Sequence, residues 1–353
     1  MNNKRFLILV LVNLPFMVFC QTPDSSKISS KNNLQAIKLY NESLEAYNQL
    51  KYLEAITMLN KSIDLHPKFV KAYYNRACFR LLSNDLDGAK TDFTYLIQLE
   101  PESKGYMGRG YVYLMKKDYL KAIEDLSVAI LNEPKNAAAY YYRGCANAQM
   151  DKLTQAIADF DKAIDLKPDY ALAYNDRGTL KIKMKEYASA KTDLTKAVTF
   201  DPSFAMAYNH LGELAALTGD NETALENFTA ALKIKPEYYL AYHNRGRIKH
   251  NTEDFKGAIE DYNKAIGIFS GYTEAFNNRG LAKYNLGDLE GAISDFTKAI
   301  ELNPKYGEAW LNRGVVKEMI RDNKGACNDW SKAAEQGITI AEKYVNSQCQ
   351  NDK

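Results

Sequence analysis

The sequence has no surplus of one charge and very few tryptophans. Its 46 Lys and Arg residues face 44 Asp and Glu residues, a formal net charge of +2. It therefore lacks the excess of positive charge that binding to a nucleic acid backbone requires, and we expect no nucleic acid partner. There are 2 tryptophans against 25 tyrosines, and a tyrosine covers apolar area while its hydroxyl group stays in water. This composition is typical of a protein with a large accessible surface.

Long apolar segments are missing too, except at the N-terminus. There, two basic residues precede an apolar stretch from Phe6 to Phe19 that is interrupted only by Asn13 and Pro15. The stretch is short for a membrane span and contains a helix-breaking proline. We interpret residues 1–20 as a secretory signal peptide, which predicts an exported protein, periplasmic or associated with the outer membrane.

The residues around the end of this stretch allow a second interpretation. Cys20 is a candidate for the acylated cysteine of a lipoprotein, but Phe19 stands where a small residue is usual, so we disfavour a lipid anchor. Residues 21–33 are polar and lack periodicity, which predicts a flexible leader. No later segment is apolar enough to suggest a membrane span in the mature chain.

The rest of the chain repeats itself with a period of 34 residues. Prolines mark the ends of most repeat units, with one interval of 33 residues and one of 68. An alanine stands twelve residues before each unit end, and it is present in all nine units. The prolines are Pro67, Pro101, Pro134, Pro168, Pro202, Pro236 and Pro304, and the alanines are Ala55, Ala89, Ala122, Ala156, Ala190, Ala224, Ala258, Ala292 and Ala326.

Small and bulky residues alternate within each unit. In one unit, Phe276 precedes Gly280 by four residues, and Phe296 follows Ala292 by four. Spacings of four place side chains on one face of a helix. We therefore predict two antiparallel helices per unit, whose backbones approach closely at the glycine and the alanine. Proline then ends the second helix, because the residue before it is driven out of the helical conformation.

The segment from Tyr174 to Pro202, YNDRGTLKIKMKEYASAKTDLTKAVTFDP, closely resembles the tetratricopeptide repeat, and the resemblance covers about residues 36–340. It implies an all-α fold, a right-handed superhelical solenoid of about nine tandem helix-turn-helix units plus a C-terminal capping helix. In this family a concave groove, lined by the first helix of each unit, binds an extended peptide or a partner helix. We predict the array over 34–340 and the capping helix and tail over 338–353. The units are predicted at about 36–69, 70–102, 103–136, 137–170, 171–204, 205–238, 239–272, 273–306 and 307–337.

An arginine and an aspartate vary together among the units. Seven units have an arginine directly before the small residue and an aspartate sixteen residues later, whereas the first and sixth units have neither. Because the two residues disappear together, we interpret them as a structural ion pair within each unit rather than as a ladder of arginines for an acidic ligand. The pairs are Arg76 with Asp92, Arg109 with Asp125, Arg143 with Asp159, Arg177 with Asp193, Arg245 with Asp261, Arg279 with Asp295 and Arg313 with Asp329.

Other first-helix residues differ from unit to unit, as a recognition surface should. We predict that they line the groove for a protein or peptide partner, where tyrosine supplies contact area and asparagine bonds a peptide backbone. The alternative is that individual tyrosines pack between adjacent first helices. The candidates are Tyr40, Tyr74, Asn75, Tyr111, Tyr141, Tyr142, Asn175, Asn209, His210, His243, Asn244, Asn277 and Asn278.

Signs of catalysis or metal binding are weak. We find no arrangement of nucleophile, base and orienting group, so we expect neither an enzyme nor a cofactor. His243 and His250 lie about 10 Å apart along a helix, too far to share one metal ion, and we predict no metal site. The spacing of Gly105 and Gly108 is similar to that of a phosphate-binding loop, but both glycines fall inside a predicted helix. We expect them to destabilise this helix.

Four cysteines follow the predicted signal peptide. An exported protein can oxidise them, and Cys327 and Cys349 lie on predicted antiparallel neighbours, which makes them the candidates for a disulfide. Free thiols are the alternative. Cys78 and Cys145 occupy equivalent positions two units apart and are too distant to pair.

The sequence thus predicts a non-enzymatic scaffold of the bacterial envelope that binds a peptide segment or partner subunit in its groove. The alternative is a regulatory or assembly subunit of a secretion or polysaccharide-export machine. The set of Lys, Asn and Arg residues with which some family members bind a chaperone's acidic tail is not assembled here, so that function is not expected.

Overall fold

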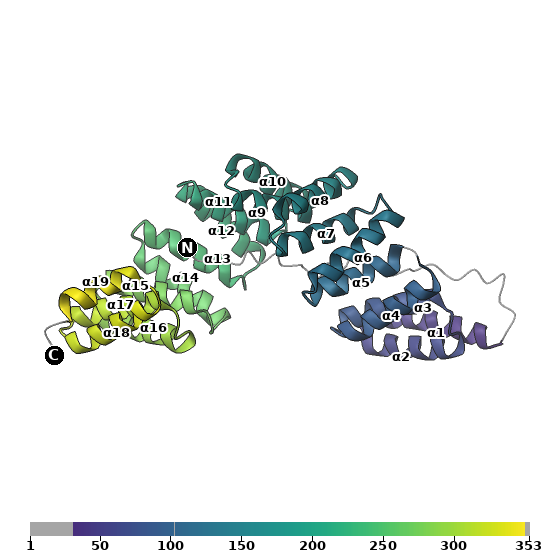
Figure 1. The fold of residues 1–353 in the computed structure, drawn as a ribbon, viewed down its shortest axis with the longest axis horizontal. Coiled ribbons are helices and arrows are strands. Elements are labelled where there is room, and N and C mark those ends of the chain that lie inside the picture. Colours follow the sequence, from purple (N-terminus) through teal and green to yellow (C-terminus); the bar gives the residue numbers. More distant parts are fainter. Residues whose placement is uncertain (1–30, 102, 350–353) are drawn as a thin grey trace. The chain divides into compact units, whose positions relative to one another are not determined.

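The computed structural model describes residues 31–101 and 103–349, and all regular elements in these two ranges are α-helices (Figure 1). The predicted signal peptide lies outside the described residues. In chain order the helices are α1 (Lys31–Asn48), α2 (Tyr52–Leu65), α3 (Val70–Leu82), α4 (Leu86–Leu99), α5 (Ser103–Met115), α6 (Tyr119–Asn132), α7 (Ala137–Gln149), α8 (Leu153–Leu166), α9 (Ala171–Lys183), α10 (Tyr187–Phe200), α11 (Ala205–Leu217), α12 (Asn221–Ile234), α13 (Tyr239–Asn251), α14 (Phe255–Ile268), α15 (Thr273–Asn285), α16 (Leu289–Leu302), α17 (Gly307–Met319), α18 (Asn323–Glu335) and α19 (Thr339–Gln348).

The chain forms two compact blocks, an N-terminal block (Met1–Asp193) and a C-terminal block (Leu194–Lys353). Within each block, helices adjacent in the chain pack against each other, as α3 does with α4 and α13 with α14. First helices of successive repeats also touch, for example α5 and α7 in one block and α13 and α15 in the other. This is the predicted all-α array of stacked helix pairs.

Small residues permit the close approach of the two helices in a pair. All nine alanines of the repeat pattern are at most 1% exposed. A Cβ atom added to Gly280 would lie 2.7 Å from Cε1 of Phe296, and one added to Gly144 would lie 2.8 Å from Cε1 of Phe160. Where the small residue of the first helix is a glycine, it is thus needed because the bulky residue of the second helix packs on its backbone.

The helix ends follow from local sequence. Several second helices begin at an aspartate whose carboxylate accepts a hydrogen bond from the backbone three residues later, as Asp254 does from the Gly257 N–H at 2.9 Å. The preceding residue, Glu253, has a φ of 64° in the left-handed region. At the other end, Glu100 is extended, as expected of a residue before a proline, and α4 stops at Leu99.

The N-terminal end of the array differs in detail from the predicted boundary. α1 begins at Lys31, so residues 31–33, which we had assigned to the leader, are helical. The capping helix α19 packs on α18, with the rings of Trp330 and Tyr344 4.8 Å apart and Ala341 fully buried. Hydrophobic periodicity marks a helix only from its first buried residue, so the polar start of α1 was missed. None of the helices in the described ranges is long and apolar enough to cross a membrane.

Candidate functional site

The structure brings together the two partners of all seven predicted arginine and aspartate pairs. Each arginine donates two hydrogen bonds through Nε and Nη2 to the carboxylate sixteen residues later, at 2.6–3.2 Å. All seven aspartates are buried. The guanidinium group also lies 4.9–5.7 Å from the ring of the aromatic residue three positions earlier. These contacts make the arginine part of the scaffold.

Each arginine also reaches the preceding repeat, which the sequence comparison did not reveal. Its Nη1 group donates to a polar side chain on the second helix of that repeat, as Arg76 does to Asn60 at 2.8 Å and Arg279 to Asn263 at 2.6 Å. The same occurs with Thr94, Ser127, Asp161, Thr229 and Thr297. The arginine therefore links two repeats: its pair with the aspartate sixteen residues later stays within one repeat, and in Arg177 the contact with Asp161 of the preceding repeat is a second ion pair.

In most of these pairs a second cationic side chain also contacts the aspartate, and we did not predict this contact. The residue four positions after the arginine contacts the same aspartate at 2.7–2.9 Å in five repeats, through Arg80, Lys181, Lys249, Lys283 and Lys317. The internal comparison contained the signal, because the first and sixth repeats, which lack the pair, have Ala46 and Ala215 at this position. The first and sixth repeats thus lack the whole polar cluster, which consists of the arginine, the aspartate and the second cation.

The groove prediction was wrong in its assumption of an open surface. Eleven of the thirteen candidates are buried, and only His210 and Asn278 are partly exposed. The reason is that the first helices of successive repeats pack side by side, so residues about one period apart meet. The buried candidates are Tyr40, Tyr74, Asn75, Tyr111, Tyr141, Tyr142, Asn175, Asn209, His243, Asn244 and Asn277. Their role in partner binding stays a prediction.

In the C-terminal block these residues bond one another in steps from repeat to repeat. The Asn244 amide donates to Asn209 Oδ1 at 3.1 Å and to Glu213 Oε1 at 2.8 Å. His243 contacts the Tyr272 hydroxyl through Nδ1 at 3.1 Å and the Asn278 amide through Nε2 at 2.9 Å. These bonds hold the first helices in register, because a buried polar group is costly unless it is hydrogen-bonded.

In the N-terminal block, the first helix α9 carries a buried acidic residue, Asp176, which also takes part in a polar contact between first helices. The Tyr141 hydroxyl donates to its Oδ2 at 2.9 Å, and the Asn175 amide donates to its Oδ1 at 2.9 Å. Burial raises the pKa of Asp176 to about 6, although these hydrogen bonds act in the opposite direction. The carboxyl group therefore gains a proton far more readily than an exposed aspartate does.

The exposed side chains of the first helices were not among the predicted site residues. On α3, α5, α7 and α9 the charged residues are lysines and arginines, apart from the buried Asp176. In the C-terminal block, α11 carries the acid Glu213 without a lysine or arginine, and α15 and α17 carry both acids and bases. The exposed side chains of the first helices include Lys104, Lys183, Arg247, Glu274, Asn285 and Glu318. The types of these residues do not recur from repeat to repeat, so the repeat pattern does not identify them.

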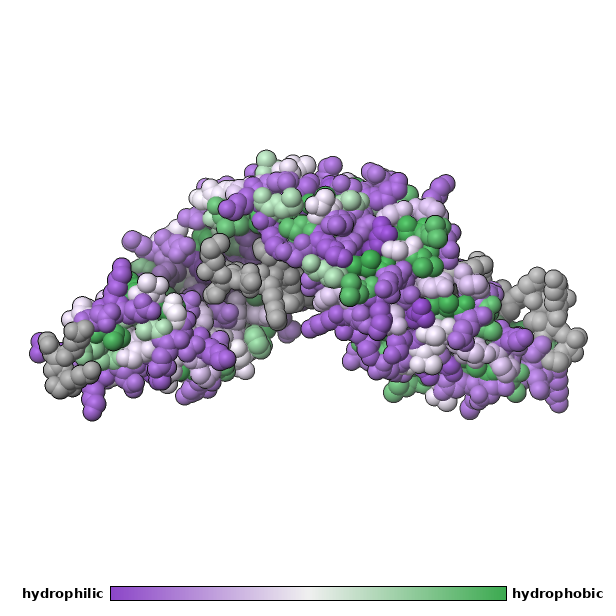
Figure 2. Space-filling view, viewed as in Figure 1, coloured by the Kyte–Doolittle hydropathy of each residue, from purple (hydrophilic) through white to green (hydrophobic). Residues whose placement is uncertain are grey.

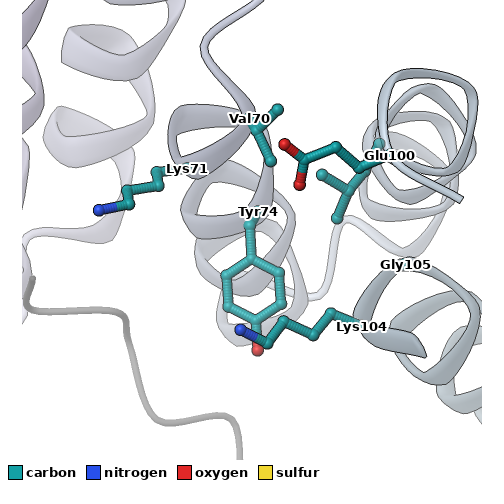
Figure 3. Close-up of a pocket in the computed structure, with 7 residues that line it drawn as sticks. Val70, Lys71, Tyr74, Glu100, Lys104 and Gly105 are labelled. Carbon is teal, nitrogen blue, oxygen red and sulfur yellow. The ribbon is translucent and has the colours of Figure 1, made fainter. Parts of the chain in front are cut away.

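A slot with a volume of about 210 Å³ opens on this side of the N-terminal block. It is lined by Val70, Lys71, Tyr74, Leu96, Glu100, Lys104 and Gly105, from α3, α4 and α5 and the residue that follows α4 (Figure 3). Tyr74 is the one predicted groove residue in this lining.

The cysteines form one disulfide. Cys327 on α18 and Cys349 at the end of α19 are bonded, so the capping helix is covalently attached to the last repeat. Cys78 and Cys145 are free thiols, and both are buried. Among the described residues, no three His, Cys, Asp or Glu side chains gather as metal ligands would.

Comparison with known proteins agrees with this architecture. Tetratricopeptide repeat models match residues 137–170, 175–239, 239–271 and 273–306. The Hsp70-Hsp90 organizing protein of Triticum aestivum is 37% identical over 94 residues, 26% of this chain and 16% of that protein. Tetratricopeptide repeat protein 16 of Homo sapiens is 29% identical over 132 residues, 35% of this chain and 15% of that protein. The chain thus spans about a sixth of the length of these curated relatives.

Solved structures show the same fold. A tetratricopeptide repeat protein from Parabacteroides merdae is similar with a TM-score of 0.54 at 17% identity, covering 70% of this chain and 99% of that one. The Cut9-Hcn1 hetero-tetramer of the APC/C gives a TM-score of 0.59 at 13% identity, covering 93% of this chain and 79% of that one. The 34-residue pattern, the stacked helix pairs and these likenesses all agree, and the chain is a tetratricopeptide repeat protein.

Proposed function

We propose that this protein is a non-enzymatic scaffold of the bacterial envelope, which binds a peptide segment or a partner subunit through the exposed side chains of its first helices. One observation supports this above all: the small, bulky and ion-paired residues of the repeat pattern recur from repeat to repeat, whereas the exposed side chains of the first helices do not. Packing explains the repetition, because each helix pair needs the same contacts with its neighbours. It gives no reason for the sequence of charges along the exposed edge.

The exposed side chains have the chemistry of a protein-binding surface. Lys183 and Arg247 are long cationic side chains, and Asn285 offers both donors and acceptors to a peptide backbone. Figure 2 shows hydrophilic and hydrophobic residues interspersed over the visible face, without one dominant apolar area. A partner would therefore be selected by its pattern of charges and hydrogen bonds, as transient protein complexes often are.

Site-specific crosslinking in the native envelope tests this proposal. A photoreactive amino acid replaces Lys183 or Arg247, and matched controls place it at Lys162 on α8 or Lys256 on α14, which are exposed on second helices. We expect the first-helix positions to form adducts with a defined protein that the controls do not form. Equal adducts at all four positions would contradict binding through the first helices. Cell fractionation with and without residues 1–20 tests the envelope location, since deletion should leave the protein in the cytoplasm.

A further inference from the structure

At most junctions between repeats, an aromatic ring packs against the neighbouring helices. It stands two residues after the proline position and packs on the first helix of the preceding repeat. The Phe69 ring lies 5.0 Å from Tyr40, that of Tyr170 lies 5.0 Å from Tyr141, and that of Tyr272 lies 4.8 Å from the His243 imidazole. The aromatic residues at this position are Phe69, Tyr170, Phe204, Tyr238, Tyr272 and Tyr306.

The junction between α4 and α5 has no such residue. Pro101 is followed by Glu102 and Ser103, and the repeat that begins here is one residue shorter than the others. The first-helix residue equivalent to Tyr40 and Tyr141 is Tyr74, and the slot of about 210 Å³ lies beside Tyr74.

One other junction lacks the aromatic residue but is filled in a different way. Between α6 and α7, Asn136 takes the position, and its amide lies 3.2 Å from Sδ of Met107, the residue equivalent to Tyr74 in that repeat. Of these two junctions without the aromatic residue, the slot lies at the one between α4 and α5, where the chain is also one residue shorter.

The size and walls of the slot define what it accepts. A cavity of about 150 Å³ is known to admit benzene, so about 210 Å³ holds a single aromatic side chain. Val70, Leu96 and the Tyr74 ring supply apolar wall. Figure 3 shows Lys71 and Lys104 on different sides of the Tyr74 ring, with the Glu100 carboxylate beside Val70. Among the described residues that line the slot, two lysines stand against one glutamate, and α3, α5, α7 and α9 add no exposed acid.

We propose that this slot binds the aromatic side chain of an acidic partner segment, with the ring in the place that Phe69 and Tyr170 occupy at other junctions and the acids facing Lys71 and Lys104. The proposal rests on the scaffold function and names its partner class: an extended segment with one phenylalanine or tyrosine between acidic residues. The ring supplies affinity by burial of apolar area, and the lysines select the charge.

Fluorescence anisotropy with a labelled seven-residue peptide tests the proposal on the full chain. The probe has a central phenylalanine with two acidic residues on each side, and a matched peptide has alanine in its place. We expect the phenylalanine peptide to bind roughly tenfold or more tightly than the alanine peptide, from burial of one ring. Val70→Trp, which fills the slot, should abolish this preference, whereas the double variant Lys71→Glu, Lys104→Glu should weaken the binding of both acidic peptides. Lys162→Glu is the control and should leave affinity within about twofold.

Equal affinity for the two peptides, no binding by the unaltered chain, or full binding by Val70→Trp would each overturn the proposal. If Val70→Trp fails to fold by circular dichroism, the two peptides on the unaltered chain still decide. The scaffold function is judged separately, because crosslinks at Lys183 and Arg247 do not involve the slot. Adducts at Lys183 and Arg247, together with equal binding of both peptides, would contradict the proposed role of the slot and support the scaffold function.

Discussion

Removing one arginine from a pair tests whether these ion pairs hold the repeats together. Arg279 in the eighth repeat donates two hydrogen bonds to Asp295, at 2.8 and 2.6 Å, and one to Asn263 of the preceding repeat at 2.6 Å. Arg279→Ala leaves the carboxylate of Asp295 buried, at 3% exposure, with the ammonium group of Lys283 at 2.9 Å as its remaining ion-pair partner. The substitution therefore removes contacts within a repeat and between two repeats at once.

The expected loss follows from the burial of the pair. Breaking a buried ion pair by removal of one partner costs about 3–5 kcal/mol, because the other charge stays in a poor environment. Lys283 remains and water can enter the space left by the arginine side chain, so we expect the lower end, about 3 kcal/mol of unfolding free energy. Arg109→Ala should cost about 1 kcal/mol more, since position 113 of that repeat is a tyrosine and Arg109 is the one cation that pairs with Asp125 among the described residues.

Urea denaturation followed by far-ultraviolet circular dichroism measures these losses. Lys298→Ala is the matched control, because Lys298 is exposed and pairs only with the exposed Glu301 in the contacts described. It should change the unfolding free energy by less than about 0.5 kcal/mol. The double variant Arg279→Ala, Asp295→Ala should recover part of the loss, since no carboxylate is then buried. If Arg279→Ala behaved like Lys298→Ala, the pairs would not stabilise the array.

Three further substitutions probe other parts of the argument by the same urea assay. The pKa of Asp176 is about 6 in the folded protein and 3.8 in the reference state, so folding favours the protonated carboxyl group. This contribution to stability is present at low pH and is lost as the pH rises from about 4 to 6, by roughly 3 kcal/mol. Asp176→Asn should abolish that loss, and an unchanged difference between pH 4 and pH 7 would refute it. Cys349→Ser should lower stability by about 3 kcal/mol, because the disulfide closes a loop between residues 22 apart; equal urea midpoints would count against an attached cap. Gly108→Ala places a Cβ atom 2.3 Å from Cε1 of Phe93, so it should destabilise by about 1–3 kcal/mol, whereas helix propensity alone would make it stabilising by about 1 kcal/mol.

The scaffold was predictable from sequence because repeat units can be compared with one another. The joint loss of arginine and aspartate in the first and sixth repeats identified the ion pair, and the structure has both partners in contact. The contact of Arg76 with Asn60 was not predictable in this way. Its acceptor is an asparagine in two repeats and a serine, threonine or aspartate in the others, so a search for one residue type does not find it.

The candidate site was harder to predict because periodicity describes one repeat unit at a time. It shows which face of a first helix meets its own second helix, but not how much of the remaining face is covered by the next first helix. Tyr141 illustrates this: it was taken for a groove residue, yet its ring contacts Tyr170 and its hydroxyl donates to Asp176 of the following repeat. The same limitation hid the packing role of Gly108, which we had treated as a weak point of its helix.

The distinction between scaffold and binding surface in this protein depends on whether a residue obeys the repeat. Contacts that recur in each repeat stabilise the array, since every repeat needs its neighbours to bury its apolar faces. A departure from the pattern must therefore either be compensated nearby or leave an opening. The sixth repeat is compensated, because Leu211 and Ala215 replace the polar cluster as a whole. The missing ring after Pro101 is not, and an opening remains beside Tyr74. Places where the repeat fails without compensation are thus the first places to search for a partner.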